Sequence, residues 1–74
     1  MQVTIKLFAT FRNGRFSIET RQLRPGATVS QTVEELRIPK GDVGVVLVNS
    51  RHASPDRVLE EGDTMALFPL LGGG

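Results

Sequence analysis

The sequence predicts an α+β fold in which one helix covers one face of a mixed β-sheet. Three observations support this prediction. Apolar and polar residues alternate along 2–7, apolar residues in 28–36 have helical spacing, and β-branched residues dominate 43–49. The expected order is strand, strand, helix, strand, an optional short strand and a final strand.

The first two strands are expected to form an antiparallel pair. The segment QVTIKL (2–7) alternates with a period of two, which is typical of a half-buried strand. Asn13-Gly14 favours a hairpin turn, because both residue types tolerate a positive φ. The alternation resumes at Phe16 and Ile18 within RFSIETRQL, and Pro25-Gly26 indicates the turn that follows this second strand.

The helix is predicted directly after that turn. Thr28 is a suitable N-cap, because its hydroxyl can accept a hydrogen bond from a free backbone N–H of the first turn. Val29, Val33 and Leu36 then fall on one face of a short helix. The helix must end before Pro39, since the residue before a proline is disfavoured in the α conformation.

The segment VGVVLVN (43–49) predicts a largely buried strand, because nearly all of its residues are apolar. The polar segment SRHASP (50–55) indicates a turn with room for one short strand. We expect DRVLEEGD (56–63) to form a compact loop whose Val58 and Leu59 reach the core. The second half of the chain therefore returns to the sheet.

Composition limits the class of protein. The 74 residues are enough for one small domain, and 39% of them are apolar, so a core can form. The absence of cysteine excludes disulfides, thiolate nucleophiles and cysteine-bound zinc, and it fits a reducing cytoplasm. No apolar run approaches about 18 residues, so neither a membrane span nor a secretory signal is expected.

The charges are divided unevenly along the chain. Residues 1–27 hold five basic residues and one acidic residue (+4), whereas residues 28–74 hold four basic and seven acidic residues (−3). A basic N-terminal half could attract nucleic acid. The four aromatic residues follow no RNA-binding or helix-turn-helix pattern, so a solvated basic face is favoured and no nucleic-acid partner is expected.

The sequence contains none of the usual catalytic constellations. His52 is the single histidine and lies in a polar turn, and the serines have no histidine pair to activate them. The carboxylates of Glu34-Glu35 and of Glu60-Glu61 are sequence neighbours, so their side chains point apart and do not form an acid–base pair. We therefore expect no catalytic activity of the chain itself, no metal site and no bound cofactor.

The last predicted strand, TMALF (64–68), runs through Pro69 towards three glycines, 72–74. Glycine is costly to order, but a chain without Cβ atoms can pass through a narrow channel and be held by backbone hydrogen bonds. The reactive group of such a tail is the α-carboxylate of Gly74, which needs activation, for instance as an acyl-adenylate. The alternative is a frayed end or a cloning remnant without function.

The closing segment carries a more specific pattern: a V-x-V-N strand, an L-x-x-G-D turn, an apolar strand with a proline, and Gly-Gly. This pattern resembles the small sulfur carriers of the MoaD and ThiS type, which have the ubiquitin-like β-grasp fold. The resemblance extends over essentially the whole chain. The matching residues are Val46, Val48 and Asn49; Leu59, Gly62 and Asp63; Met65 to Phe68; Pro69; and Gly73-Gly74.

The resemblance implies a β-grasp domain over 1–71 and a flexible glycine tail over 72–74. It further implies that a partner enzyme of the ubiquitin-activating type uses ATP to adenylate the Gly74 carboxylate, with Gly73 as the other member of the recognised pair. A sulfur donor such as a cysteine desulfurase then allows formation of a thiocarboxylate. The sulfur passes to an accepting synthase, of which such a chain can be the small non-catalytic subunit.

The receiving pathway stays open at this point. Pro69-Leu70 replaces the two prolines usual in molybdopterin carriers, and three glycines are more typical of thiamine carriers, whereas Phe8-Ala9-Thr10 is similar to the molybdopterin type. The tail is therefore compatible with molybdopterin, tungsten-pterin or thiamine biosynthesis and with amino-acid sulfuration. Two other functions also remain: a ubiquitin-like protein modifier, and a non-catalytic β-grasp interaction module.

The pattern also predicts a docking surface. If Val3, Ile5 and Leu7 face the helix, Phe8 faces the opposite side, and the same alternation turns Phe68 outward. The β-grasp fold makes the first and last strands parallel neighbours, so the two rings should lie together. We predict that this patch docks the activating and accepting enzymes, unless a loop covers it. The remaining predicted contact residues, which guide the tail, are Leu70, Leu71 and Gly72.

Overall fold

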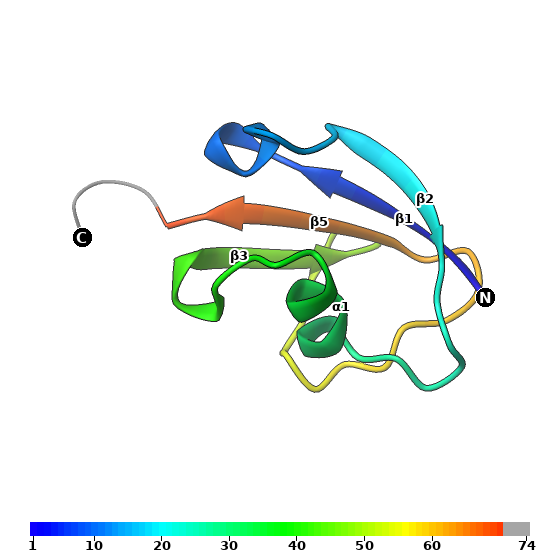
Figure 1. Ribbon diagram of the computed structural model, residues 1–74. Coiled ribbons are helices and arrows are strands. Elements are labelled where there is room, and N and C mark those ends of the chain that lie inside the picture. The colour runs from blue at the N-terminus through cyan, green and yellow to red at the C-terminus, as the bar shows by residue number, and fades with distance from the viewer. Residues whose placement is uncertain (71–74) are drawn as a thin grey trace.

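A computed structural model describes residues 1–70, which form one mixed sheet of five strands with a helix against one face (Figure 1). The strand order across the sheet is β2-β1-β5-β3-β4. This arrangement confirms the predicted α+β class and order of elements. The elements are β1 (Gln2–Leu7), η1 (Ala9–Arg12), β2 (Ile18–Gln22), α1 (Val29–Glu35), η2 (Lys40–Asp42), β3 (Val43–Val48), β4 (Arg51–His52) and β5 (Thr64–Pro69), with η denoting a 3₁₀-helix.

The first and last strands, β1 and β5, pair in parallel at the centre of the sheet. Ile5 lies opposite Met65, and Leu7 lies opposite Leu67. β2 joins the free side of β1 and β3 joins the free side of β5, both antiparallel. The two segments most distant in sequence therefore lie side by side, as Figure 1 shows.

The core lies between the sheet and α1. The inward residues of β1 and β5 have no exposed surface, and the three predicted residues of the helix stripe are almost as buried. Burial of each such side chain contributes about 1.5–3 kcal/mol relative to leaving it in water. The side chains concerned are Val3, Ile5, Leu7, Met65 and Leu67 from the sheet, and Val29, Val33 and Leu36 from the helix region.

The helix begins where the sequence predicts. The Thr28 hydroxyl accepts a hydrogen bond from the Gln31 N–H at 3.1 Å, and the Gln31 side-chain carbonyl accepts one from the Thr28 N–H at 3.0 Å. This reciprocal pair is a capping box, which satisfies two backbone donors of the first turn. Because α1 has only seven residues, its stability depends mainly on its packing against the sheet.

The predicted hairpin turn is wrong in detail. A turn does form at Asn13-Gly14, where the Arg15 N–H donates to the Arg12 carbonyl at 3.0 Å and Gly14 has a φ of +70°. Asn13, however, has a φ of −64° and the connection includes the 3₁₀-helix η1, so this turn does not join the two strands as a two-residue hairpin loop. β2 starts only at Ile18. Phe16 precedes the strand and packs against the core, whereas Ile18 is 58% exposed on the other face. Phe16 and Ile18 therefore do not belong to one strand with a single buried face, although their spacing in the sequence suggested it.

Two predicted burial assignments are also corrected. β3 is not largely buried: Val48 is the one fully buried residue of the strand, and Val45 is 37% exposed. This occurs because α1 covers only the inward face of the sheet. Leu59 reaches the core, as predicted, but Val58 is 49% exposed. Adjacent residues of an extended segment point in opposite directions, so both could not be buried.

The start of β5 is fixed by a polar connection to the end of β3. The Asn49 side-chain amide donates to a carboxylate oxygen of Asp63 at 2.9 Å and accepts from the Thr64 N–H at 2.9 Å. The other carboxylate oxygen of Asp63 accepts from the Glu60 N–H at 2.8 Å. Asp63 is only 7% exposed, and these bonds compensate for its loss of water. The asparagine of the V-x-V-N motif and the aspartate of the G-D motif therefore bond to each other, and together they fix the start of β5.

The end of β5 is held by the backbone of residues 42–44. The Leu70 N–H donates to the Asp42 carbonyl at 2.9 Å, and the pairing of β3 with β5 shifts between Val43 and Val45. Gly44 occupies this irregularity, and a Cβ atom there would lie 2.9 Å from the Pro69 carbonyl oxygen. Glycine is thus required for the close approach of the two backbones.

We expect Gly44→Ala to lower the free energy of unfolding by about 1–3 kcal/mol, because its methyl group overlaps backbone atoms that cannot rotate away. Gly41→Ala is the matched control, since a Cβ at Gly41 meets no atom within 4 Å. The control should change stability by less than about 1 kcal/mol. Urea denaturation measures both values. Equal values for the two variants would show that the close approach at Gly44 carries no structural constraint.

Candidate functional site

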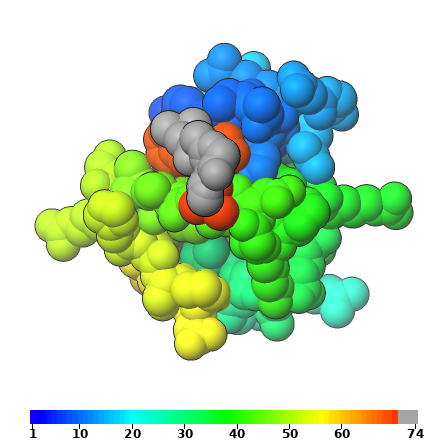
Figure 2. Space-filling view, turned by 90° about the vertical axis from the view of Figure 1, so that its left-hand side faces the viewer, coloured from blue at the N-terminus to red at the C-terminus, as the bar shows by residue number. Residues whose placement is uncertain are grey.

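The candidate site lies at the end of the sheet where β5 finishes. Pro69 is the last residue of β5, and Leu70, which follows it, is 64% exposed. Figure 2 views this end of the molecule and shows the orange end of β5 between the blue N-terminal segment and green β3. Two different parts of the chain therefore flank the base of the predicted tail.

Phe8 and Phe68 stack on each other beside this base. Their ring centroids are 4.3 Å apart and their planes differ by 12°. The Phe8 N–H also donates to the Leu67 carbonyl at 3.2 Å, which extends the parallel pairing by one residue. The two rings thus lie together on the outward face, as the sequence predicts. Each ring covers part of the other, and both are partly buried.

Arg12 adds a cation to the aromatic pair. Its guanidinium carbon lies 5.6 Å from the Phe8 centroid, within the range of a cation–π interaction. Its Nε–H donates to the Leu7 carbonyl at 2.9 Å, and this bond fixes the side chain. No sequence pattern singles out Arg12, because its approach to Phe8 depends on the 3₁₀ conformation of η1.

Apolar side chains continue from the rings across the outward face. Val45 lies opposite Phe68, and Leu47 lies opposite Ala66, so these residues share one face of the sheet. A shallow groove of about 550 Å³ follows them and is also lined by Leu70. We call this surface the outer patch. It consists of Phe8, Val45, Leu47, Ala66, Phe68 and Leu70.

A second, smaller cleft of about 260 Å³ flanks the tail base on the helix side. Phe11 and Ile38 supply its apolar lining, and Arg15 and Asp42 supply its charged groups. Arg15 is held by hydrogen bonds from its guanidinium to the carbonyls of Phe11 and Arg37. Pro69 and Leu70 line both this cleft and the groove beside the outer patch. The tail base is therefore bordered by recesses on two sides.

The predicted site residues are only partly placed by the structure. Phe8, Phe68 and Leu70 come together as described above. Leu71 and Gly72 lie outside the described residues, and so do Gly73 and Gly74, the predicted acceptor pair. Their predicted roles stay predictions. Gly44 and Arg12 are the two site features that the sequence analysis missed.

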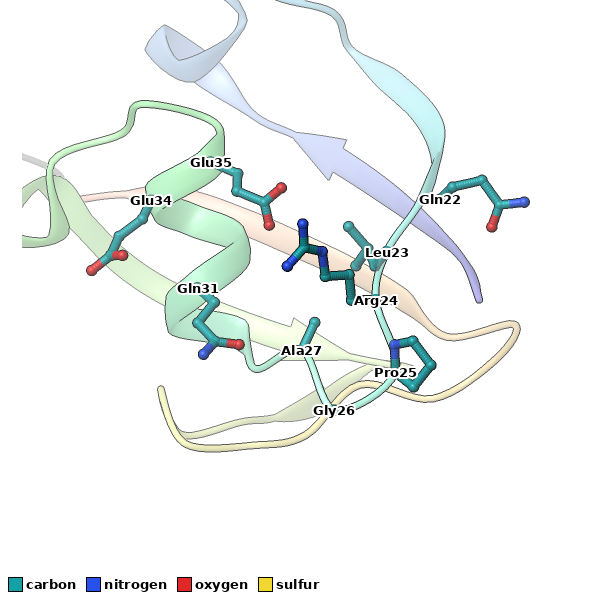
Figure 3. A pocket seen from close by; sticks show the side chains of 9 residues that line it. All are labelled: Gln22, Leu23, Arg24, Pro25, Gly26, Ala27, Gln31, Glu34 and Glu35. Atoms are coloured by element: carbon teal, nitrogen blue, oxygen red, sulfur yellow. The ribbon is translucent and has the colours of Figure 1, made fainter.

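Another groove, of about 750 Å³, lies between residues 22–27 and α1. Figure 3 shows the side chains of Arg24 and Glu35 reaching towards each other across it. None of its lining residues belongs to the tail base or to the outer patch. Its position on the helix side makes it a separate feature of the surface.

The rest of residues 1–70 contains few other candidate functional sites. No group of three or more His, Asp or Glu residues in this part is placed to hold a metal ion. Within the same residues, no helix is long and apolar enough to cross a membrane. His52 is exposed on β4, opposite Leu47, at the border of the outer patch.

Comparison with known proteins supports the pattern found in the sequence. The model of the ThiS family matches residues 5–74. Among solved structures, a protein assigned as molybdopterin converting factor subunit 1 from Pyrococcus furiosus is 31% identical, with a TM-score of 0.78 over 96% of this chain and 99% of that one. No curated protein matches the sequence significantly.

Two more distant structures share the fold. Small archaeal modifier protein 1 of Haloferax volcanii is 22% identical, with a TM-score of 0.76 over 95% of this chain and 98% of that one. A chain of the complex of molybdopterin-converting factor subunits 1 and 2 from Helicobacter pylori is 16% identical, with a TM-score of 0.67 and full coverage of both chains.

The family match extends over nearly the whole chain, and the relative at 31% identity covers it almost completely. The TM-score of this relative agrees with the sheet topology described above. The chain therefore belongs to the ThiS family and is a ubiquitin-like β-grasp protein of the MoaD/ThiS type.

Proposed function

We propose that this protein is a sulfur carrier whose Gly74 carboxylate is adenylated by a partner enzyme and converted to a thiocarboxylate. The observation that carries the proposal is the family match, which runs through residue 74. The anchored base at Leu70, with the outer patch beside it, supports the proposal, because it provides a surface that can dock an enzyme next to the tail.

The chemistry requires an external activating enzyme. A carboxylate resists attack because its leaving group would be oxide. Attack of the Gly74 carboxylate on the α-phosphorus of ATP would release pyrophosphate and form an acyl-adenylate. A thiol reduces the persulfide of a donor such as a cysteine desulfurase, is itself oxidised to a disulfide and releases sulfide. The sulfide then displaces AMP from the acyl-adenylate, so that sulfur replaces one carboxylate oxygen. Glycines favour this step, because a tail without Cβ atoms can enter a narrow active site.

The proposed partners follow from this sequence of steps. They are an adenylating enzyme of the ubiquitin-activating type, a sulfur donor and an accepting synthase of molybdopterin, tungsten-pterin or thiamine biosynthesis. The Helicobacter pylori structure contains subunit 1 of molybdopterin-converting factor in complex with subunit 2, which gives a precedent for a synthase partner. We place the reaction in the cytoplasm, where ATP is available. The chain itself acts as a co-substrate and not as an enzyme.

A second candidate function is protein modification. The structural likeness to small archaeal modifier protein 1 favours it. The activation step would be the same, but a lysine amine of a target protein would attack the activated carbonyl and form an isopeptide bond. Covalent adducts of higher mass in a cell extract would identify this function.

The proposed carrier role predicts a mass change. Incubation with ATP, the adenylating enzyme of the same organism and a sulfur donor should increase the intact mass by the ~16 Da of oxygen-to-sulfur exchange. Deletion of Gly73-Gly74 should abolish the gain, because the acceptor carboxylate is then displaced. Intact-mass spectrometry measures both proteins. If the truncated protein also supports its biological pathway in a complementation assay, the tail is incidental and the chain is an interaction module.

The outer patch predicts a separable binding defect. Phe68→Ala should weaken binding to the adenylating enzyme by about 1–3 kcal/mol, as expected for an aromatic anchor. It should lower folding stability by only about 1 kcal/mol, because the ring is partly exposed and its main loss is the stack with Phe8.

Calorimetric titration and thermal unfolding together test this expectation. Val58→Ala serves as the control, since Val58 is an exposed apolar residue that lies outside the outer patch. The control should bind like the unmodified protein. If Phe68→Ala unfolds readily but binds normally when folded, Phe68 belongs to the core and the docking surface lies elsewhere.

A further inference from the structure

We infer that the outward face of the sheet recognises a protein surface in which carboxylates surround an apolar socket. This inference rests on the proposed function, since it specifies the chemistry of the enzyme that docks on the outer patch. It is carried by the distribution of charge over the two faces of the sheet.

The outward face carries cations and no carboxylates. Strand pairing and burial place alternate residues of each strand on this face, and none of those in residues 1–70 is Asp or Glu. Lys6 is the cation among them, and Arg12 stands over the Phe8 ring beside it. The outward strand residues are Gln2, Thr4, Lys6, Ile18, Thr20, Gln22, Val45, Leu47, His52, Thr64, Ala66 and Phe68.

The acidic residues all lie outside the outward strand positions, and the Glu61 carboxylate, which accepts from the Gln2 N–H at 3.0 Å, lies at the end of β1 away from Phe8. Glu19 is opposite the inward residue Ile5, and its carboxylate pairs with Arg21. Glu34 and Glu35 lie on α1 on the other side of the sheet. Asp42 follows in η2, and the remaining four acids, Asp56, Glu60, Glu61 and Asp63, lie in the loop before β5. A chain with a net charge of only +1 thus presents a locally positive docking face.

The two cations border the apolar residues that a partner would cover. Lys6 lies opposite Ala66 on one side and opposite Ile18 on the other, and its side chain is exposed. Arg12 uses one of its five N–H donors for the Leu7 carbonyl, so the rest of the guanidinium can bind a carboxylate. Carboxylates opposite Lys6 and Arg12 would accelerate association and fix the orientation of the partner.

A protein fits this face better than a nucleic acid does. Binding of single strands relies on aromatic rings that accept bases on their faces. Here Phe8 and Phe68 already cover each other at 4.3 Å between centroids. Val45, Leu47 and Ala66 need apolar contacts, which a phosphate backbone does not supply. The face therefore matches an apolar socket with acidic neighbours.

The test compares two charge reversals that change the net charge equally. Lys6→Glu alters the docking face, whereas Arg24→Glu alters the groove on the helix side that Figure 3 shows. Lys6→Gln is the milder third variant, in case the reversal disturbs the fold, and circular dichroism checks all three. Stopped-flow kinetics with the adenylating enzyme of the same organism then give the association rate from about 0.01 M to about 1 M salt, across which the Debye length falls from ~30 Å to ~3 Å.

We expect the association rate of Lys6→Glu to fall about tenfold or more at low salt, and that of Lys6→Gln to fall less. Arg24→Glu should stay within about threefold of the unmodified protein. The rate of the unmodified protein should decrease as salt rises. This set of results would support an acidic rim on the partner.

Other outcomes overturn the inference. The inference fails while the proposed function stands if the unmodified protein gains sulfur normally but its association rate is independent of salt. The same holds if the association rates of Lys6→Glu and Arg24→Glu are equal. If no binding and no mass gain occur, the proposed function fails, and the inference fails with it. If single-stranded oligothymidylate binds with an affinity that Lys6→Glu removes, and the enzyme does not bind, the partner is a nucleic acid.

Discussion

The parallel pairing of β1 with β5 is the contact on which the rest of the structure depends. It places Leu7 opposite Leu67 in the core and, one residue further, brings Phe8 against Phe68 on the outward face. Because side chains of a strand alternate between faces, the same two strands supply the centre of the core and the centre of the outer patch. A shift of one residue in this pairing would exchange the two sets of side chains.

The polar contacts at the two ends of β5 maintain this pairing. Asn49 and Asp63 fix where the strand begins, and the carbonyl of Asp42 with the narrow space at Gly44 fixes where it ends. The base of the tail therefore continues from a strand that is held at both ends, by side-chain bonds at its start and by backbone contacts at its end. In the proposed carrier function, such a base would give the activating enzyme a defined starting point for the glycines, which would limit the conformational entropy lost when the tail is bound.

Much of the fold could be predicted from the sequence, because its main signals are local. Alternation predicted the central strands, and Thr28 as an N-cap predicted the helix start. The structure of η1 could not be predicted, since it depends on a side-chain bond from Arg12 to Leu7 and on packing at the sheet end. The role of Gly44 was equally hidden, because its neighbours in space, Pro69 and Leu70, are distant in sequence. The resemblance to sulfur carriers predicted the acceptor pair Gly73-Gly74, which stays a prediction, and it predicted none of the contacts of Arg12 and Gly44.

In the proposed function, the outward face docks the activating enzyme and α1 only supports the fold. The most direct test is a titration of isotopically labelled protein with that enzyme, followed by nuclear magnetic resonance of its backbone amides. The account predicts that signal changes and slowed hydrogen exchange concentrate at Phe8, Val45, Leu47 and Phe68. Changes concentrated instead along α1 and the groove at residues 22–27, with the outward face unaffected, would contradict it.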